Sequence, residues 1–196
     1  MKTKLIASAL TGALALTLFP SALQAGDITD KWTVDVSLYG LMASMSGEAG
    51  IGPVNADVDV DFGQVLDKLN FGAMGTVRVG YGRWALSTDV IYMNLEADDG
   101  PFTAELQQLL VQPQIEYWVC RNFGAYVGTR YNSMKTELRG PLGVNPSGTE
   151  DWWDPVIGGK VWLPIGEKLS FNVTGDIGGF SVGSDFSWQA FPYFDW

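Results

Sequence analysis

Strict alternation of apolar and polar residues recurs along the chain and constrains its fold more than any other feature. In the segment that begins at Trp32, apolar side chains occupy every second position, and polar ones such as Asp35 lie between them. Successive side chains of a β-strand point to opposite faces, so a period of two predicts a strand with one apolar and one polar face. Eight such segments predict an all-β protein of antiparallel strands in up-and-down order, at 32–43, 71–81, 84–92, 108–119, 123–132, 154–163, 169–177 and 186–196.

The connections between these segments differ in length from one end of the strands to the other. Turns near 82–83, 120–122 and 166–167 are tight, while 44–70, 97–103 and 139–151 are predicted as longer loops; a tight hairpin at Gly183-Ser184 is the exception. Short periplasmic turns and longer extracellular loops are typical of transmembrane β-barrels. A two-residue turn at Gly82-Arg83 also predicts the register, with Thr76 opposite Asp89 and Arg78 opposite Ser87.

The N-terminal segment is typical of an export signal. Lys2 and Lys4 precede an apolar run, Leu5–Phe19, and Ala25 is a small residue suited to cleavage before Gly26. A membrane anchor is the alternative, but the run is short for a spanning helix and lacks a basic flank. We therefore predict a signal peptide at 1–25, a barrel domain at 26–196 and a location in the outer membrane.

Alternation alone does not say which face of the barrel is outside. A soluble barrel places its apolar side chains inside, whereas a membrane barrel places them against lipid. Charges of both signs lie in mid-strand on the polar face among small residues, which suits mutual neutralisation in a narrow interior. We expect a structural charge network of Asp35, Arg78, Asp89, Glu116, Arg130, Lys160 and Asp176.

Aromatic residues at the ends of the apolar stripes also favour the membrane. The chain has 8 Trp, 7 Tyr and 10 Phe, and only 17% of its residues are charged. Amphipathic rings prefer the level of the lipid headgroups. We expect an aromatic girdle of Trp32, Phe71, Tyr81, Trp84, Tyr92, Tyr117, Phe123 and Tyr131.

Composition excludes several classes of function. The chain has no histidine, which removes the commonest general base and metal ligand, and paired carboxylates among cations favour ion pairing over acid–base catalysis. A net charge of −10 without a basic cluster argues against nucleic acid. The single cysteine, Cys120, allows no internal disulfide. We predict no enzyme activity, no catalytic residue and no cofactor.

One acidic row is a weak candidate for a metal site. Asp57, Asp59 and Asp61 share one face of an alternating stretch and offer oxygen ligands suited to Ca²⁺ or Mg²⁺, but they lack the glycine and terminal glutamate of an EF-hand loop. A solvated acidic loop is the favoured interpretation, so we predict no metal. The following segment, 62–69, has spacing compatible either with a short amphipathic helix or with an ordered loop.

Several segments resemble a known family. Gly175–Gln189 reads GDIGGFSVGSDFSWQ and Gly82–Leu95 reads GRWALSTDVIYMNL; Trp152–Lys160 and Asp59–Gly75 match two further segments. These are similar to segments of uncharacterised Gram-negative outer-membrane β-barrel proteins of the porin-like superfamily. The resemblance implies a barrel without an established substrate, and family members usually continue with another hairpin, so a longer form would have about ten strands, an even number.

The sequence leads to one expectation about function and one alternative. We expect a structural or envelope-interaction barrel with a side-chain-filled interior, because eight strands leave room for little else. The alternative is a passive channel for small solutes. Expected partners are outer-membrane lipid, lipopolysaccharide and the barrel-assembly machinery, and no oligomeric state is indicated.

Overall fold

The described part of the computed structural model consists of β-strands and their connections. It comprises residues 11–14, 28–38, 40–43, 45–51, 54–60, 69–99, 102–139, 147–165 and 169–195. Within these ranges no residue is helical. None of the described elements is therefore a helix long and apolar enough to cross a membrane.

Eight strands form one antiparallel sheet, in the order β12-β11-β10-β9-β8-β7-β6-β2. Each strand pairs with its neighbours in up-and-down fashion, which confirms the predicted number and direction of strands. Their bounds are β2 Thr29–Leu38, β6 Leu69–Gly82, β7 Trp84–Asp99, β8 Phe102–Cys120, β9 Phe123–Arg139, β10 Ser147–Pro164, β11 Ser170–Gly178 and β12 Ser187–Asp195.

Two short strand pairs lie outside the main sheet. β1 (Thr11–Leu14) pairs with β3 (Gly40–Ala43), and β4 (Met45–Ile51) pairs with β5 (Val54–Val60). β1 also contacts β12. Because β1 belongs to the segment expected to be an export signal, cleavage after Ala25 would remove this strand.

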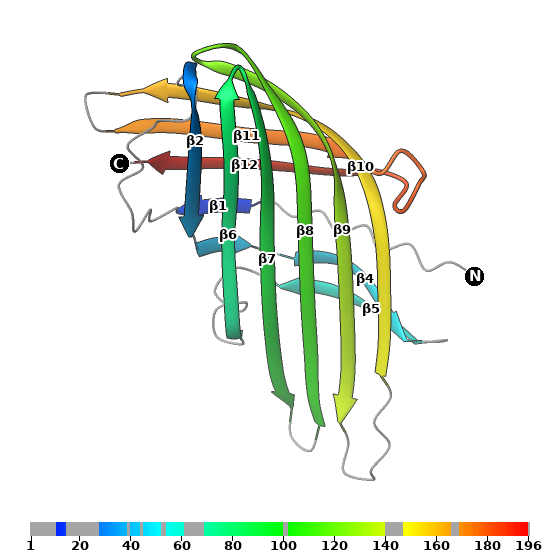
Figure 1. Cartoon of the computed structure of the whole chain (residues 1–196). Coiled ribbons are helices and arrows are strands. Elements are labelled where there is room, and N and C mark those ends of the chain that lie inside the picture. The colour runs from blue at the N-terminus through cyan, green and yellow to red at the C-terminus, as the bar shows by residue number, and fades with distance from the viewer. Residues whose placement is uncertain are drawn as a thin grey trace.

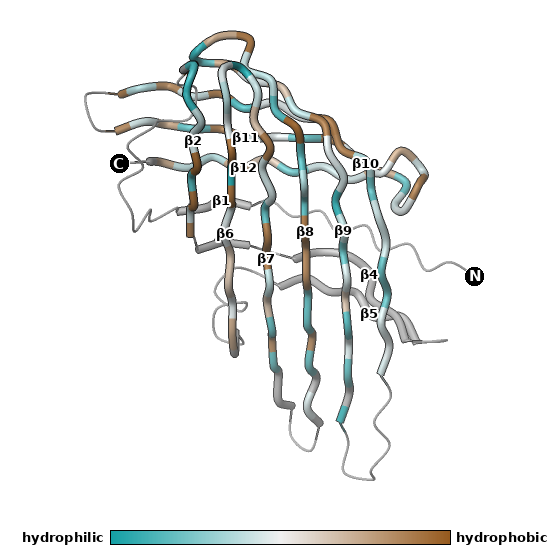
Figure 2. The backbone as a smooth tube through the Cα atoms, in the orientation of Figure 1, coloured by the Kyte–Doolittle hydropathy of each residue, from teal (hydrophilic) through white to brown (hydrophobic). Residues whose placement is uncertain are grey.

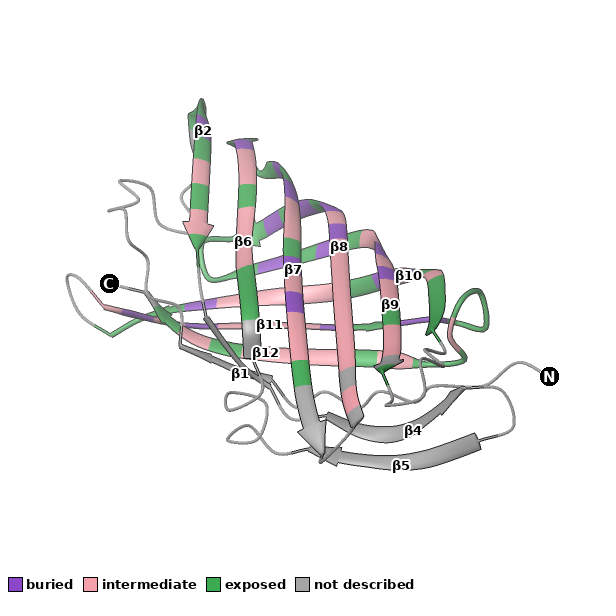
Figure 3. Ribbon diagram, turned by 90° about the horizontal axis from the view of Figure 1, so that it is seen from below, coloured by how far each residue is buried: buried purple, intermediate pink, exposed green. Residues whose placement is uncertain are grey.

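The main sheet is strongly curled. In Figure 1, β2 and β6 to β9 lie in front, β10 bends at the right, and β11 and β12 run behind them. The view from below in Figure 3 shows the same curl, with β10, β11 and β12 crossing under the other strands. The sheet thus has a convex outer face and a concave inner face, and β2 and β12 are its two edges.

The turns at one end of the sheet follow the sequence closely. Tyr81 pairs with Trp84 across the Gly82-Arg83 turn, and Gly82 has a φ of 59°, a conformation that glycine adopts without steric cost. The register that results places Thr76 opposite Asp89 and Arg78 opposite Ser87, as the two-residue turn predicts.

Several predicted boundaries are wrong. The loop expected at 139–151 is shorter, because β10 already begins at Ser147. The segment 32–43 is not one strand, because the main-sheet strand ends at Leu38. The long loop expected at 97–103 is mostly strand, since β7 and β8 stay paired up to Asp99 and Phe102. Main-chain pairing continues there although the side chains are polar, and polarity alone had indicated a loop. The hairpin expected to be tight at Gly183-Ser184 is a wider connection between Gly178 and Ser187.

The segment 44–70, expected to be a long loop, has a different arrangement. The alternating stretch at Val54–Phe62 contributes β5, which pairs with β4 and not with the main sheet. The expected helix or loop at 62–69 lies outside the described residues, apart from Leu69, which begins β6.

Burial in the sheet is inverted relative to a soluble protein. Large apolar side chains are exposed along the convex face: Trp32 is 73% exposed and Val127 is 54% exposed. Many of the buried side chains are polar or charged, and Figures 2 and 3 show hydrophobic and exposed stretches alternating with buried ones along the strands. Because burying a charge without partners is costly, the concave face must supply partners for its own polar groups.

Candidate functional site

Glu116 is the centre of one charge cluster on the concave face. Its carboxylate is 1% exposed and pairs with the ammonium group of Lys160 from β10. The Ser87 hydroxyl donates to Oε1 at 2.5 Å, and the Trp118 indole lies 3.4 Å from Oε2 as a further donor. Strands β7, β8 and β10 therefore all contribute to holding one buried carboxylate.

Arg78 connects this cluster to the edge of the sheet. Its Nε donates to Glu116 at 3.2 Å and its Nη1 donates to Asp35 at 3.0 Å. Asp35 lies directly opposite Arg78 on β2. Asp89 accepts a hydrogen bond of 2.8 Å from the Thr76 hydroxyl across β6 and β7.

A second cluster surrounds Asp176 on β11. Arg130 Nη2 donates to Oδ1 of Asp176 at 2.6 Å. The other carboxylate oxygen, Oδ2, accepts hydrogen bonds from the Tyr126 hydroxyl at 2.8 Å and from the Gln189 amide at 2.8 Å. Asp176 is 6% exposed, so these donors replace most of its contact with water.

Glutamines on β8 join the two clusters. Gln112 donates to Asp176 at 3.1 Å and to Gln114 at 3.2 Å, while Gln114 donates to the Ser87 hydroxyl at 2.9 Å. Gln112 also accepts from Arg130 Nε at 2.8 Å. Hydrogen bonds thus run without interruption from one edge of the sheet to the other, through Asp35, Arg78, Glu116, Ser87, Gln114, Gln112, Asp176 and Gln189.

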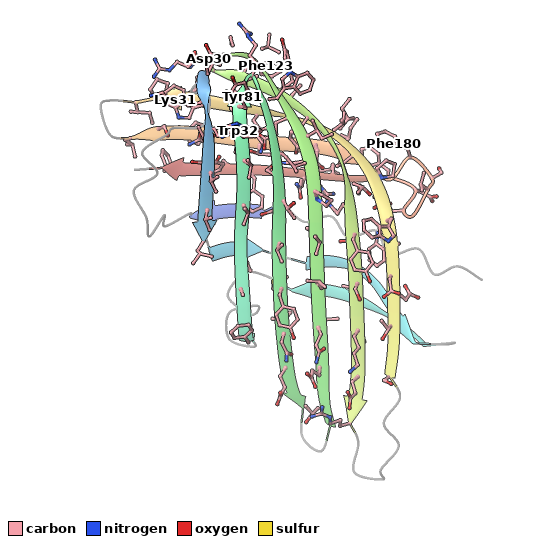
Figure 4. The ribbon with its side chains drawn as sticks, in the orientation of Figure 1. Asp30, Lys31, Trp32, Tyr81, Phe123 and Phe180 are labelled. Atoms are coloured by element: carbon pink, nitrogen blue, oxygen red, sulfur yellow. The ribbon has the colours of Figure 1, made fainter. Side chains whose placement is uncertain are left out.

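The predicted aromatic residues form two rows on the convex face. At the turn end, the Trp32 ring lies 5.2 Å from Tyr81 and the Trp84 ring lies 4.8 Å from Tyr117. Figure 4 shows Trp32, Tyr81 and Phe123 together at this end. We call Trp32, Tyr81, Trp84, Tyr117 and Phe123 the turn-side row.

The second row lies at the other end of the apolar stripes. The Phe71 ring is 6.0 Å from Tyr92, and the Tyr131 ring is 4.8 Å from Trp153. We call these four residues the loop-side row. Trp153 was not among the predicted girdle residues, although its place directly opposite Tyr131 in the register puts it there.

The convex face becomes hydrophilic beyond the loop-side row. Glu105 accepts hydrogen bonds from Gln107 at 2.7 Å and from Asn94 at 3.2 Å, and it pairs with Arg139 at 2.8 Å. Arg139 also pairs with Glu137 at 3.0 Å. Figure 2 shows the same change in hydropathy toward the lower ends of β9 and β10. The apolar part of the outer face is therefore a band with an edge on each side.

The connection between β11 and β12 is fixed to β10 by a buried carboxylate. Asp154, 1% exposed, accepts from the Ser184 amide at 2.7 Å and from the Ser184 hydroxyl at 2.8 Å. Phe180 and Ser181 in the same connection have φ values of 47° and 63°, which strain residues other than glycine. Backbone hydrogen bonds from Ser181 to Asp185 and from Val182 to Gly179 also lie within this connection.

Several residues of the network were not predicted. Ser87, Gln112, Gln114 and Gln189 lie on the polar face of their strands, but uncharged residues had not been assigned a role. Tyr126 also projects from the concave face, and its ring occupies the space that a side chain at Gly158 would fill, 2.4 Å from an ideal Cβ. The alternation of the strand already places Tyr126 on the same face as Gly124 and Arg130, and this pattern could have predicted its position.

The acidic row Asp57, Asp59 and Asp61 lies where the structure describes no side chains; only the backbone of Val54–Val60 is described there. Among the residues whose placement is described, no group of three or more acidic, cysteine or histidine side chains is arranged to hold a metal ion.

Comparisons with known proteins place no further constraint on this site. No family model, curated protein or solved structure matches the chain. The resemblance carried by Gly175–Gln189 therefore stays a prediction.

Proposed function

We propose that the protein is an outer-membrane β-barrel with a structural or envelope-interaction role and no catalytic activity. The inverted burial of the sheet carries this proposal: large apolar side chains are exposed on its convex face, and a connected polar network lies on its concave face beside buried residues such as Trp118 and Trp162. A soluble barrel has the opposite arrangement, whereas lipid on the outside and a polar interior account for both faces. Closure brings the edges β2 and β12 together, directly or through further strands.

The height of the apolar band supports this orientation. From Trp84 to Tyr92, and from Phe123 to Tyr131, the chain crosses from one aromatic row to the other in about eight residues, or roughly 26 Å of strand. With a tilt of about 40°, the rows are roughly 20 Å apart along the membrane normal, close to the ~25 Å apolar band of such barrels. Outer-membrane lipid and lipopolysaccharide are the expected contacts, and the assembly machinery would insert the barrel after cleavage of 1–25.

The filled interior favours a structural role over the passive channel considered as the alternative. Gln112 of β8 and Asp176 of β11 meet across the concave face at 3.1 Å. A through-path for solutes would have to avoid these contacts. Purified protein reconstituted into planar bilayers is expected to show no reproducible conductance steps, and such steps would favour the channel.

Site-specific labelling tests the orientation directly. In a Cys120→Ser background, a single cysteine is placed either at Leu86 or at Ser87. The two positions form a matched pair, because they are adjacent and point to opposite faces. Leu86 is exposed and Ser87 is buried. In outer-membrane vesicles, a lipid-soluble maleimide is expected to label position 86 and to spare position 87. Equal labelling of both, or protein recovered in the soluble periplasmic fraction, would refute the proposal.

A further inference from the structure

The N-terminal part of β10 has a neighbour on one side only. β10 pairs with β9 along Ser147–Val161, but it pairs with β11 only from Val156 to Pro164. Among the described residues, no strand continues along the other side of Ser147–Trp153, and Ser147–Asp151 is exposed throughout. In Figure 1, β10 descends beside β9 well beyond the connection between β11 and β12. We call Ser147–Trp153 the free edge.

The backbone shows which residues direct hydrogen-bonding groups toward this free edge. The Pro155 carbonyl accepts from the Gly179 amide on the β11 side, and the Trp153 carbonyl lies against Gly183 on that side. Alternate residues of an antiparallel strand direct both main-chain groups to the same side. Thr149 and Asp151 therefore present their N–H and C=O groups outward, where a further strand could pair with them.

Side chains along the free edge indicate what kind of strand would pair there. Glu150 and Asp151 are exposed and acidic, on opposite faces of the strand, and Trp152 and Trp153 follow them. Asp151 accepts one hydrogen bond from Ser133 at 3.1 Å. Among the described residues, none of the ion pairs includes Glu150. Cross-strand neighbours of opposite charge stabilise a sheet, as do apolar residues beside aromatic ones.

We propose that the free edge of β10 binds an extended basic peptide segment by strand addition, with two basic residues beside Glu150 and Asp151 and apolar residues beside Trp152 and Trp153. Main-chain hydrogen bonds supply affinity in this mode of recognition, and alternate side chains supply specificity. A second copy of the chain is a poorer partner, since antiparallel pairing centred on this segment places Glu150 against Glu150.

The connection between β11 and β12 closes one end of this docking edge. Ser184 is hydrogen-bonded to the buried Asp154, and a Cβ at Gly183 would come within 2.4 Å of the Trp153 carbonyl. An added strand therefore cannot continue past Trp153, and Ser147, Thr149 and Asp151 are left as its main-chain partners. Strand addition at this edge does not require the apolar band to lie in lipid.

The test uses the purified full chain and three synthetic peptides. The first peptide places two lysines next to two valines in a strand-forming sequence, the second replaces the lysines with glutamates, and the third carries N-methyl groups at alternate positions. Binding is measured by fluorescence anisotropy, and amide exchange is measured at Thr149 and Asp151. We expect saturable binding of the first peptide alone, with at least tenfold slower exchange at both amides.

Two variants locate the interaction on the protein. Thr149→Pro removes an amide that points to the free edge and is expected to abolish binding, while Thr149→Val keeps that amide and is expected to bind normally. Glu150→Lys weakens binding at least tenfold without altering the backbone, and it replaces the proline test if that variant does not fold. Binding that tolerates N-methylation or glutamate, or that survives both variants, overturns the proposal. Self-association through this edge would also overturn it.

Discussion

Gln112 on β8 donates a hydrogen bond to Asp176 on β11, although β9 and β10 lie between these strands in the sheet. For these two side chains to touch, the sheet must curl until β8 and β11 face each other across the concave side. Tyr126 and Arg130 of β9 bind the same carboxylate. Asp176 therefore connects β11 to both β8 and β9 across the concave face.

Removing the charge of Asp176 is expected to destabilise the protein strongly. Asp176→Asn leaves the buried Arg130 guanidinium without its carboxylate, and breaking a buried ion pair costs about 3–5 kcal/mol. Urea unfolding in detergent or vesicles measures the change. The exposed Glu150→Gln is the control and should alter stability by less than about 0.5 kcal/mol. An Asp176→Asn variant as stable as the control would mean that the cluster contributes little.

Glycine at position 158 is expected to be required, whereas glycine at 159 is not. A Cβ at Gly158 would lie 2.4 Å from Tyr126 Cζ and 2.5 Å from the Gly175 carbonyl oxygen, while a Cβ at Gly159 meets nothing closer than 3.5 Å. Gly158→Ala should therefore cost about 1–3 kcal/mol of unfolding free energy, and Gly159→Ala should be neutral or slightly stabilising. Equal effects of the two variants would contradict the packing of Tyr126.

The connection between β11 and β12 is expected to loosen when its tie to Asp154 is removed. Ser184→Ala deletes the hydroxyl that donates to the carboxylate at 2.8 Å, an interaction with a charged group worth about 1.5–3 kcal/mol. Limited proteolysis within Gly179–Phe186 should become at least tenfold faster, with Ser147→Ala as a distant control. Unchanged cleavage would show that the connection holds its shape without Asp154.

Glu105, beyond the loop-side row, is expected to titrate below its ordinary value. The Gln107 amide lowers its pKa most, and the Asn94 amide and the nearby Arg139 add to the effect. A depressed pKa in the folded state stabilises the protein above the unfolded-state pKa of 4.5, and this contribution is lost as the pH falls through the folded-state value. A ¹³C carboxyl titration should show the depression, and Gln107→Ala should reduce it. An unchanged titration in that variant would exclude the amide as its main cause.

Arginine substitutions on the convex face of β9 test the proposed insertion into a membrane. Val127 lies midway between Phe123 and Tyr131, whereas Ser133 lies beyond the loop-side row. Val127→Arg should reduce the free energy of folding into lipid vesicles by about 2–4 kcal/mol, and Ser133→Arg by about 0–1 kcal/mol. Similar costs at both positions would place the apolar band in water or against protein.

The sequence predicts the main sheet well because alternation is a local signal. Every second residue of a strand faces the same way, so the partners at Gly82-Arg83 and the polar side of each strand follow from the chain alone. Boundaries were less predictable. At Asp98 and Thr103 the side chains are polar, but the backbone continues to pair, and no local pattern distinguishes a polar strand from a loop.

The candidate site was partly predictable for the same reason. Arg78 and Asp35 share a face and a register position, and the interaction between them follows from adjacent strands. The contact between Gln112 and Asp176 does not, because it depends on the curvature of the whole sheet. Tyr126 likewise reaches Asp176 only because Gly158 leaves space on the neighbouring strand.

The strands of the sheet end at unequal heights, and this has a consequence for how a partner could reach that end. β7 to β10 extend well past the loop-side row, while β11 ends opposite Val156 and β12 begins beside that end. This end of the sheet is therefore higher on the side of β7 to β10 than on the side of β11 and β12. In the proposed outer-membrane orientation, a large molecule approaching this end would meet polar strand ends on the side of β7 to β10 and a lower edge at β11 and β12. Its direction of approach would therefore be restricted before any contact forms.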